Sequence, residues 1–236
     1  METIQIADGQ IFLLLLRGLL VAAIPFAAFF RLRQKHGGRG FPVFVGVITV
    51  MLILLPRELF RNVLIKGAET DTGKWLTVWL VGAIFEECGR YVAMKHAIPN
   101  YDTVPDALCY GIGHGGTEVI MSARLQFVLL ADALGQSGTP EHLAAISEQG
   151  ILTALGVLLG NAGNLACHMG LSVLVMRAVH YEGCKKLLPL AVFLHMLGNF
   201  TDFCFGTAAE VMLTVLIWIF VYLHGKRLQE REFDAY

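Results

Sequence analysis

Charged residues are scarce in this sequence, and their scarcity excludes an ordinary soluble domain. Only 16% of the 236 residues are Asp, Glu, Lys or Arg, whereas 56% are hydrophobic and the mean hydropathy is +0.62. Soluble domains carry about 25% charged residues. The formal net charge of −1 gives no reason to expect nucleic acid as a partner. We therefore expect an all-α, polytopic membrane protein, with residues 1–236 forming one transmembrane domain in the lipid bilayer of the plasma membrane.

Paired cysteine motifs and a cleavable targeting segment are also lacking. The five cysteines form no C-x-x-C pair, so we interpret them as small packing residues and not as disulfides or thiolate metal ligands. The N-terminal METIQIADGQ has no basic residue and contains Glu2 and Asp8, which is unlike a secretory signal peptide. We expect the first apolar segment to be a permanent span.

Long apolar runs, in contrast, are abundant. A membrane span needs about 20 mainly apolar residues. We predict seven spans, at about residues 11–31, 42–60, 74–97, 106–133, 150–180, 186–205 and 208–225. Small residues repeat within them, as at Gly111/Gly115 and Gly156/Gly160, which predicts close packing between helices.

Basic residues predict the orientation of the spans, because cytoplasmic loops are enriched in Lys and Arg. The loop after the first span contains Arg31, Arg33, Lys35 and Arg39, which places the N-terminus outside and the C-terminus in the cytoplasm. The connection 57–74 does not fit, since it holds four basic residues but lies outside in this arrangement.

Four of the predicted spans carry polar residues that lipid would reject. In the third span, Glu86 and Glu87 lie within one helical turn of Arg90, and in the fourth span His114 lies one turn before Glu118. Two further spans carry polar stripes at helical spacing, namely Asn161, Asn164, His168 and Ser172 in the fifth, and His195, Asn199 and Asp202 in the sixth.

The cost of burying charge predicts that these groups converge. A charged side chain at the centre of a bilayer costs roughly 2.5–3.5 kcal/mol, so three uncompensated glutamates would strain a fold whose total stability is about 5–15 kcal/mol. The four groups Glu86, His114, His168 and His195 lie about 12–20 Å from the predicted cytoplasmic ends of their spans, at 1.5 Å per residue. We therefore expect one polar centre, reached by water from the cytoplasmic side.

Each of these groups also has a structural interpretation. Glu86 or Glu87 could form an ion pair with Arg90 that locks helices together, although adjacent acids point about 100° apart and serve different neighbours. One of two carboxylates in a low dielectric can instead act as a general base or acid. A lone histidine in a span is usually a hydrogen-bonded core residue, whereas three at one depth match a catalytic zinc site. The H-E-x-x-H signature is absent, so the spacing leaves the metal open.

The motifs EECGRY, GHGGTE, CHMGLSVLV and LHMLGNFTDF, in this order, resemble the YhfC family of intramembrane metalloproteases. The likeness covers about Gly82 to Phe205, is similar to the PrsW and CAAX-prenyl-protease (Abi) group, and extends to the seven-span Aph subunit of gamma-secretase. The resemblance implies hydrolysis at the matching positions, which are Glu86, Glu87, Arg90, His114, Glu118, His168, His195 and Asn199. The CAAX group commonly spaces its arginine one residue further from the acids.

We therefore predict an intramembrane peptidase. One of the adjacent glutamates, Glu86 by preference, activates a water, and Arg90 keeps the neighbouring acid ionised. Three histidines, His114, His168 and His195, bind Zn²⁺, while Glu118 and Asn199 orient neighbouring groups or stabilise the oxyanion. The substrate is a membrane-anchored or lipidated peptide or protein. The alternatives are a metal-independent glutamate-type protease, a non-catalytic scaffold and a proton-coupled transporter.

Overall fold

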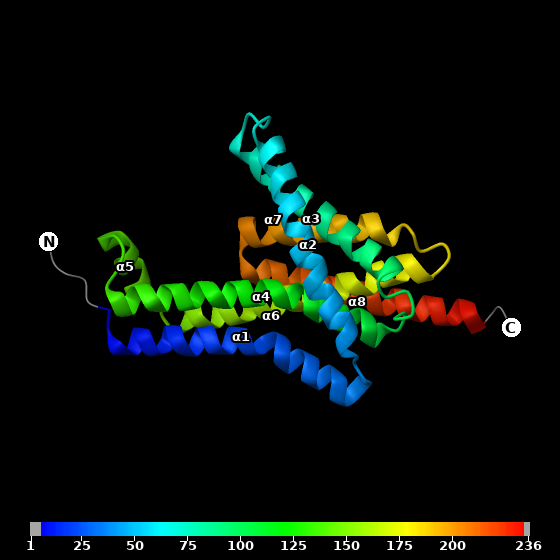
Figure 1. Ribbon diagram of the computed structural model, residues 1–236, viewed down its shortest axis with the longest axis horizontal. Helices are drawn as coiled ribbons and strands as arrows, with labels where there is room; N and C mark the ends of the chain where they lie inside the picture. Colours follow the sequence, from blue (N-terminus) through cyan, green and yellow to red (C-terminus); the bar gives the residue numbers. More distant parts are fainter. Residues whose placement is uncertain (1–5, 234–236) are drawn as a thin grey trace.

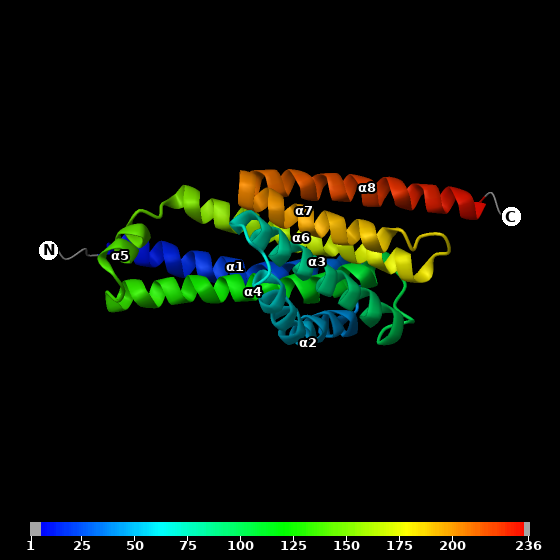
Figure 2. The ribbon, with the colours of Figure 1, turned by 90° about the horizontal axis from the view of Figure 1, so that it is seen from above.

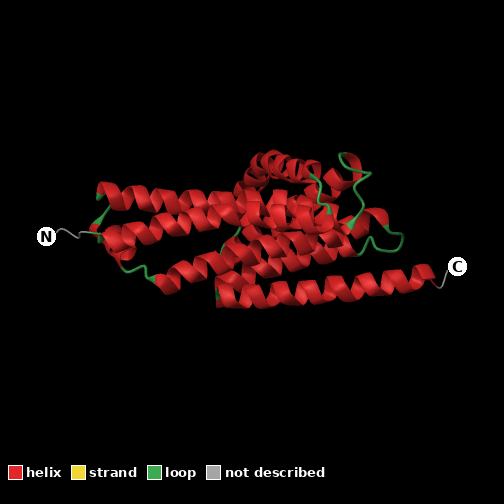
Figure 3. Cartoon of the chain, turned by 90° about the horizontal axis from the view of Figure 1, so that it is seen from below, coloured by secondary structure: helices red, strands yellow, loops and turns green. Residues whose placement is uncertain are grey.

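The computed structural model of the protein describes residues 6–233, which form eight helices and no strand (Figure 3). In chain order they are α1 (Asp8–His36), α2 (Gly40–Ile65), α3 (Asp71–His96), α4 (Val104–Gly135), α5 (Pro140–Ser147), α6 (Ile151–His180), α7 (Leu187–Phe205) and α8 (Thr207–Phe233). The all-α prediction is confirmed, and each predicted span coincides with a helix, although α1 and α2 extend five residues and α8 eight residues beyond the predicted ends.

Local sequence signals set where several helices begin. The side chain of Thr70 caps α3, and Thr103 forms a capping box with Asp106 at the start of α4. The short helix α5 was not predicted, although its start carries the same kind of signal. Thr139 is its N-cap, and Pro140 lies in its first turn, where a proline removes no helical hydrogen bond.

Five of the helices in the described chain are long and apolar enough to cross a membrane. They are α1, α2, α6, α7 and the 207–229 part of α8. The other two long helices, α3 and α4, contain the acidic residues of the polar centre together with Arg90 and His114. Crossing by α3 and α4 depends on other helices enclosing those charges, so the seven-span count and the orientation of the termini stay predictions.

Most of the long helices run along the long axis of the molecule, whereas α2 and α3 form a hairpin that crosses the others obliquely (Figure 1). Helix α4 packs against α1, α2 and α6, and α6 also packs against α8. In the perpendicular view α6 lies between α8 and the pair of α1 and α4 (Figure 2). Helix α3 contacts α2, α7 and α6, so its middle faces the interior of the bundle.

Glycines allow α4 to approach its neighbours closely. A β-carbon added at Gly113 would lie 2.0 Å from a backbone oxygen of α2, and one at Gly111 would lie 2.6 Å from a Cα atom of α6. One at Gly115 would lie 2.7 Å from the side chain of His168. Close packing is thus confirmed for Gly111 and Gly115, but it is wrong for Gly156, which has nothing within 4 Å. The contact at Gly115 places α6 directly beside the histidine of α4.

Large apolar side chains cover much of the outer surface. Leu52, Leu152 and Phe205 are 72%, 81% and 70% exposed, and many other leucines and phenylalanines are more than half exposed. Soluble monomers rarely expose apolar surface on this scale. Lipid is the solvent that suits such a surface, in agreement with the five apolar helices.

Candidate active site

Helices α2, α3, α4, α6 and α7 bring their polar side chains to one buried place. The groups that meet there are Arg57 from α2, Glu86, Glu87 and Arg90 from α3, His114 and Glu118 from α4, His168 from α6 and His195 from α7. All except Arg57 and Glu118 are buried. The predicted convergence of acids and imidazoles is therefore what the folded chain contains.

Glu86 is the carboxylate with the most partners in this cluster. Its Oε1 accepts a hydrogen bond from Nη1 of Arg57 at 2.6 Å, and its Oε2 lies 3.2 Å from Nε2 of His114. The same Oε2 lies 3.6 Å from Nε2 of His195, which is too long for a hydrogen bond. Arg57 thus occupies one carboxylate oxygen, and the other faces two imidazoles.

Glu87 lies on the adjacent face of α3 and serves different partners. Its Oε2 accepts from Nη1 of Arg90 at 2.7 Å, and its Oε1 lies 2.8 Å from Nδ1 of His195. Because an ionised carboxylate only accepts, Nδ1 of His195 carries the proton. In the neutral form of the ring, Nε2 would then present a lone pair toward Glu86. A carboxylate behind one imidazole nitrogen is the usual support for a histidine that binds a metal through the other.

His168 has an arginine, and not a carboxylate, beside its Nδ1. Its Nδ1 lies 3.0 Å from Nη2 of Arg90, and its Nε2 lies 3.0 Å from Oε2 of Glu118. A guanidinium only donates, so Nδ1 of His168 must accept. The neutral ring therefore carries its proton on Nε2 and donates it to Glu118. Binding of a metal through Nε2 would move the proton to Nδ1, where it would face the Arg90 donor.

The three imidazoles form a row. The ring centres of His114 and His168 are 5.1 Å apart, as are those of His168 and His195. Nδ1 of His114 is buried and has no hydrogen-bond partner among the described residues. Nε2 of His114 donates to Glu86 in this arrangement. Binding of a ligand through Nε2 would move the proton to Nδ1, which faces no donor in the part of the chain that the structure describes, whereas Nδ1 of His168 faces the Arg90 donor.

Two sets of side chains are close enough to hold a metal ion. One comprises Glu86, His168 and His195, and the other comprises Glu86, His114 and Glu118. In each set the ligand atoms lie within 4.8 Å of one another. Glu86 belongs to both, and neither set joins all three histidines.

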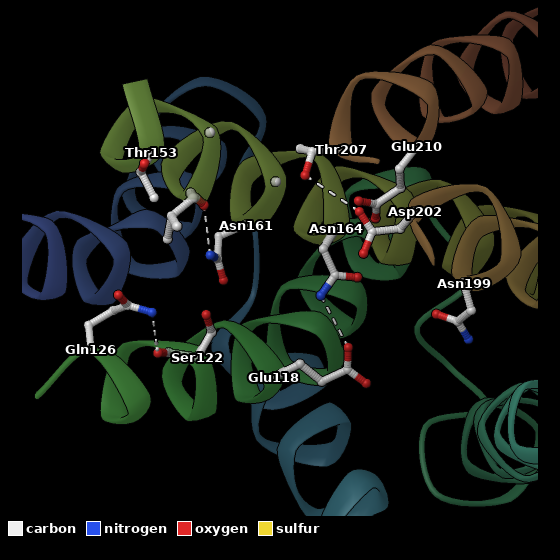
Figure 4. Close-up of a pocket in the computed structure, with 13 residues that line it drawn as sticks. Glu118, Ser122, Gln126, Thr153, Asn161, Asn164, Asn199, Asp202, Thr207 and Glu210 are labelled. Carbon is white, nitrogen blue, oxygen red and sulfur yellow. Dashed lines mark hydrogen bonds between the residues drawn. The ribbon is translucent and has the colours of Figure 1, made fainter. Parts of the chain in front are cut away.

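Two adjoining cavities reach this cluster. The smaller, about 360 Å³, is lined by Arg57, Glu86 and His195 together with Trp79 and Phe203. The larger, about 600 Å³, lies between α4, α6, α7 and the first turn of α8 (Figure 4). Glu118, Asn199 and Asp202 line both. Asn199 therefore lines the site, but within the described chain it forms no hydrogen bond with the acids or imidazoles.

The larger cavity, which we call the polar cleft, extends toward the end of the molecule where α7 turns into α8. Thr153 near the start of α6, and Thr207 and Glu210 near the start of α8, lie in its wall. This is the end opposite the connections 37–39, 97–103 and 181–186, which we predicted to be cytoplasmic. The polar cleft extends away from those connections, and entry of water from the cytoplasmic side stays a prediction.

The sequence reasoning missed Arg57. It placed this residue in a basic connection that fitted the orientation poorly, whereas Arg57 lies inside α2, with its side chain 21% exposed and bonded to Glu86. The misfit itself was the available signal, since a basic residue that does not belong in an outer loop needs an acidic partner elsewhere. Gln126, Thr207 and Glu210 in the polar cleft were missed as well.

Comparisons with known proteins find a family and a relative. The family model described as YhfC intramembrane metalloprotease matches residues 20–221 of the chain. A protein of Bacillus subtilis (strain 168) named "Uncharacterized membrane protein YhfC" is 27% identical over 250 residues, which cover 92% of this chain and 96% of that protein. No solved structure matches the chain.

Proposed function

We propose that this chain, which belongs to the YhfC intramembrane metalloprotease family, hydrolyses a peptide bond inside the membrane with a water activated at Glu86. The observation that carries the proposal is the position of the Glu86 carboxylate. It is buried, it has one oxygen held by Arg57 and the other facing two imidazoles, and it lines a cavity of about 360 Å³. A structural ion pair would need no such space beside it.

The donor set fits a metal. Two ligand atoms that are each about 2.0–2.2 Å from a tetrahedral zinc are about 3.3–3.6 Å apart, and Oε2 of Glu86 lies 3.6 Å from Nε2 of His195. Glu87 supports His195 from behind, as carboxylates do for metal-binding histidines. Glu86 and His195 would hold the ion. The set that contains both is completed by His168, which we expect to contribute less because Arg90 donates to its Nδ1. When bound, the metal supplies a Lewis acid for the scissile carbonyl and a water that ionises readily.

The side chains of the site have separate roles in the reaction. When no metal is bound, Oε2 of Glu86 takes the proton of the attacking water and passes it to the leaving amine; with a metal bound, Oε2 is instead a ligand and the ionised water comes from the metal. In both cases Arg57 holds Oε1 and keeps the carboxylate ionised. Glu87 and Arg90 fix the rings of His195 and His168 from within the protein. Asn199, at the junction of the two cavities, is the side chain free to donate to the oxyanion.

A cleavage assay tests the proposal. Purified protein in liposomes is incubated with a mixed panel of membrane-anchored and lipidated peptides, and the products are identified by mass spectrometry. We expect cleavage of at least one peptide and loss of turnover in Glu86→Gln, while the exposed Glu69→Gln control in the α2–α3 loop stays active. A panel left intact by monodisperse protein, or cleavage by Glu86→Gln at the normal rate, refutes the proposal and favours the non-catalytic scaffold.

A further inference from the structure

The polar cleft has more negative than positive charge in its wall. Three carboxylates line it, those of Glu118, Asp202 and Glu210, and the lining contains no lysine or arginine. Glu118 is bonded to Asn164 and His168. Asp202 accepts only a long bond of 3.4 Å from Thr207, and within the described residues neither Asp202 nor Glu210 has a basic nitrogen within 4.0 Å.

Asp202 and Glu210 lie side by side across the turn between α7 and α8 (Figure 4). Two like charges this close, in a cleft that lipid-facing helices surround, repel each other. A positively charged group between them would remove the repulsion and form two ion pairs. The place that suits a cation is therefore between these two carboxylates of the cleft wall and not beside Glu86.

A second observation points to a ligand that donates hydrogen bonds. Gln126 lines the cleft at only 5% exposure, and its Oε1 has no partner in the described chain. Its Nε2 makes a 3.4 Å bond to the backbone oxygen of Ser122, which leaves Oε1 as the unused atom. A buried amide oxygen without a donor is costly, and a backbone N–H of an extended peptide is the donor that a protease cleft receives.

We propose that the polar cleft binds the extended, polar segment of a substrate peptide and selects a basic residue there, whose ammonium or guanidinium group pairs with Asp202 and Glu210. This inference rests on the proposed peptidase function and names its substrate class. Asp202 is seven residues after His195 on α7, about 10 Å along the helix. That distance equals roughly three residues of extended chain, so the basic residue lies about three residues from the bond that is cut.

The test compares peptides that differ only in this residue. Each has the same leucine-rich membrane anchor and polar segment, with lysine, norleucine or glutamate at the third position from the scissile bond. We expect kcat/KM for the lysine peptide to exceed that for the norleucine peptide by roughly 10-fold, as two partly exposed ion pairs would give, and the glutamate peptide to be cut least. Because the peptides share one N-terminus, the preference for lysine over norleucine reports on the side chain alone, and acetylation of the N-terminus should leave it intact.

Variants locate the preference in the cleft. Asp202→Asn/Glu210→Gln should reduce the lysine preference to less than about threefold. The control Glu69→Gln/Glu148→Gln makes the same change of two charges on exposed residues outside the cleft and should leave the preference unchanged. Equal cleavage of the lysine and norleucine peptides by the unmodified protein overturns the inference while leaving the peptidase proposal standing. If no peptide is cut, the proposed function fails. In that case the binding of the same peptides, carrying a fluorescent label, to Glu86→Gln tests the cleft inference separately. Equal affinity for the lysine and norleucine peptides overturns that inference.

Discussion

Replacement of Arg57 by methionine tests whether Glu86 depends on a cation from α2. The Arg57 and Glu86 side chains are 21% and 5% exposed and their Nη1 and Oε1 atoms are 2.6 Å apart. Removal of one partner from a fully buried ion pair costs about 3–5 kcal/mol. Because Arg57 is partly exposed, we expect a smaller loss of about 1.5–3 kcal/mol, the range for a hydrogen bond to a charged group.

Arg61→Met is the matched control. Arg61 lies one turn further along α2, its side chain is 34% exposed, and it pairs with Glu58, which also contacts Arg57 but not Glu86. An exposed pair of this kind contributes at most about 1 kcal/mol. Equilibrium unfolding in mixed micelles, followed by tryptophan fluorescence, compares the two variants, and peptide cleavage is measured on the same preparations.

The double variant Arg57→Met/Glu86→Gln separates loss of the partner from loss of packing. Since no unpaired carboxylate remains in it, we expect it to regain most of the free energy of unfolding that Arg57→Met loses. The reasoning is refuted if Arg57→Met is as stable and as active as Arg61→Met. It is also refuted if the double variant is no more stable than Arg57→Met, because the cost then comes from packing alone.

Three further predictions concern the metal, the second carboxylate and the helix contacts. Elemental analysis of purified protein should find a metal that His195→Ala loses and His168→Ala largely keeps; equal loss in both would show that His168 is a ligand despite its arginine partner. Glu87→Gln should lower the free energy of unfolding by about 3 kcal/mol or more, because it leaves the buried guanidinium one turn away without a carboxylate, and an unchanged unfolding curve contradicts this. Gly113→Val should lower the melting temperature by several degrees, since its β-carbon would overlap the α2 backbone. Gly156→Ala, at a position that faces open space, should leave it unchanged. Equal melting temperatures for the two variants would contradict the close contact between Gly113 and α2.

The sequence was sufficient to predict the helices and the meeting of acids and imidazoles, because both follow from the cost of polar groups in lipid. In lipid, an apolar run of span length satisfies its backbone hydrogen bonds by forming a helix, and buried glutamates must find partners. Glu86, Glu87 and the three histidines met for this reason. Caps were also readable, and the threonine–proline start of α5 was overlooked although it carries the usual signal.

Features that depend on how the helices pack were not predictable. Arg57 reaches Glu86 because the α2–α3 hairpin crosses the bundle obliquely (Figure 1), and no periodicity in the sequence encodes that crossing. The direction of the polar cleft depends on which helices separate, and depth counted from helix ends says nothing about gaps between helices. Gly156 illustrates the same limit, because its spacing to Gly160 matches close packing although it borders the cleft.

The most direct test of hydrolysis at Glu86 is cleavage of a membrane-anchored peptide in isotopically labelled water, with the products weighed by mass spectrometry. The unmodified protein should place one labelled oxygen in the new carboxyl terminus, and folded Glu86→Gln should yield no product. Product formation by Glu86→Gln at the same rate, or an intact peptide panel with the unmodified protein, would contradict the assignment of Glu86 as the group that activates water.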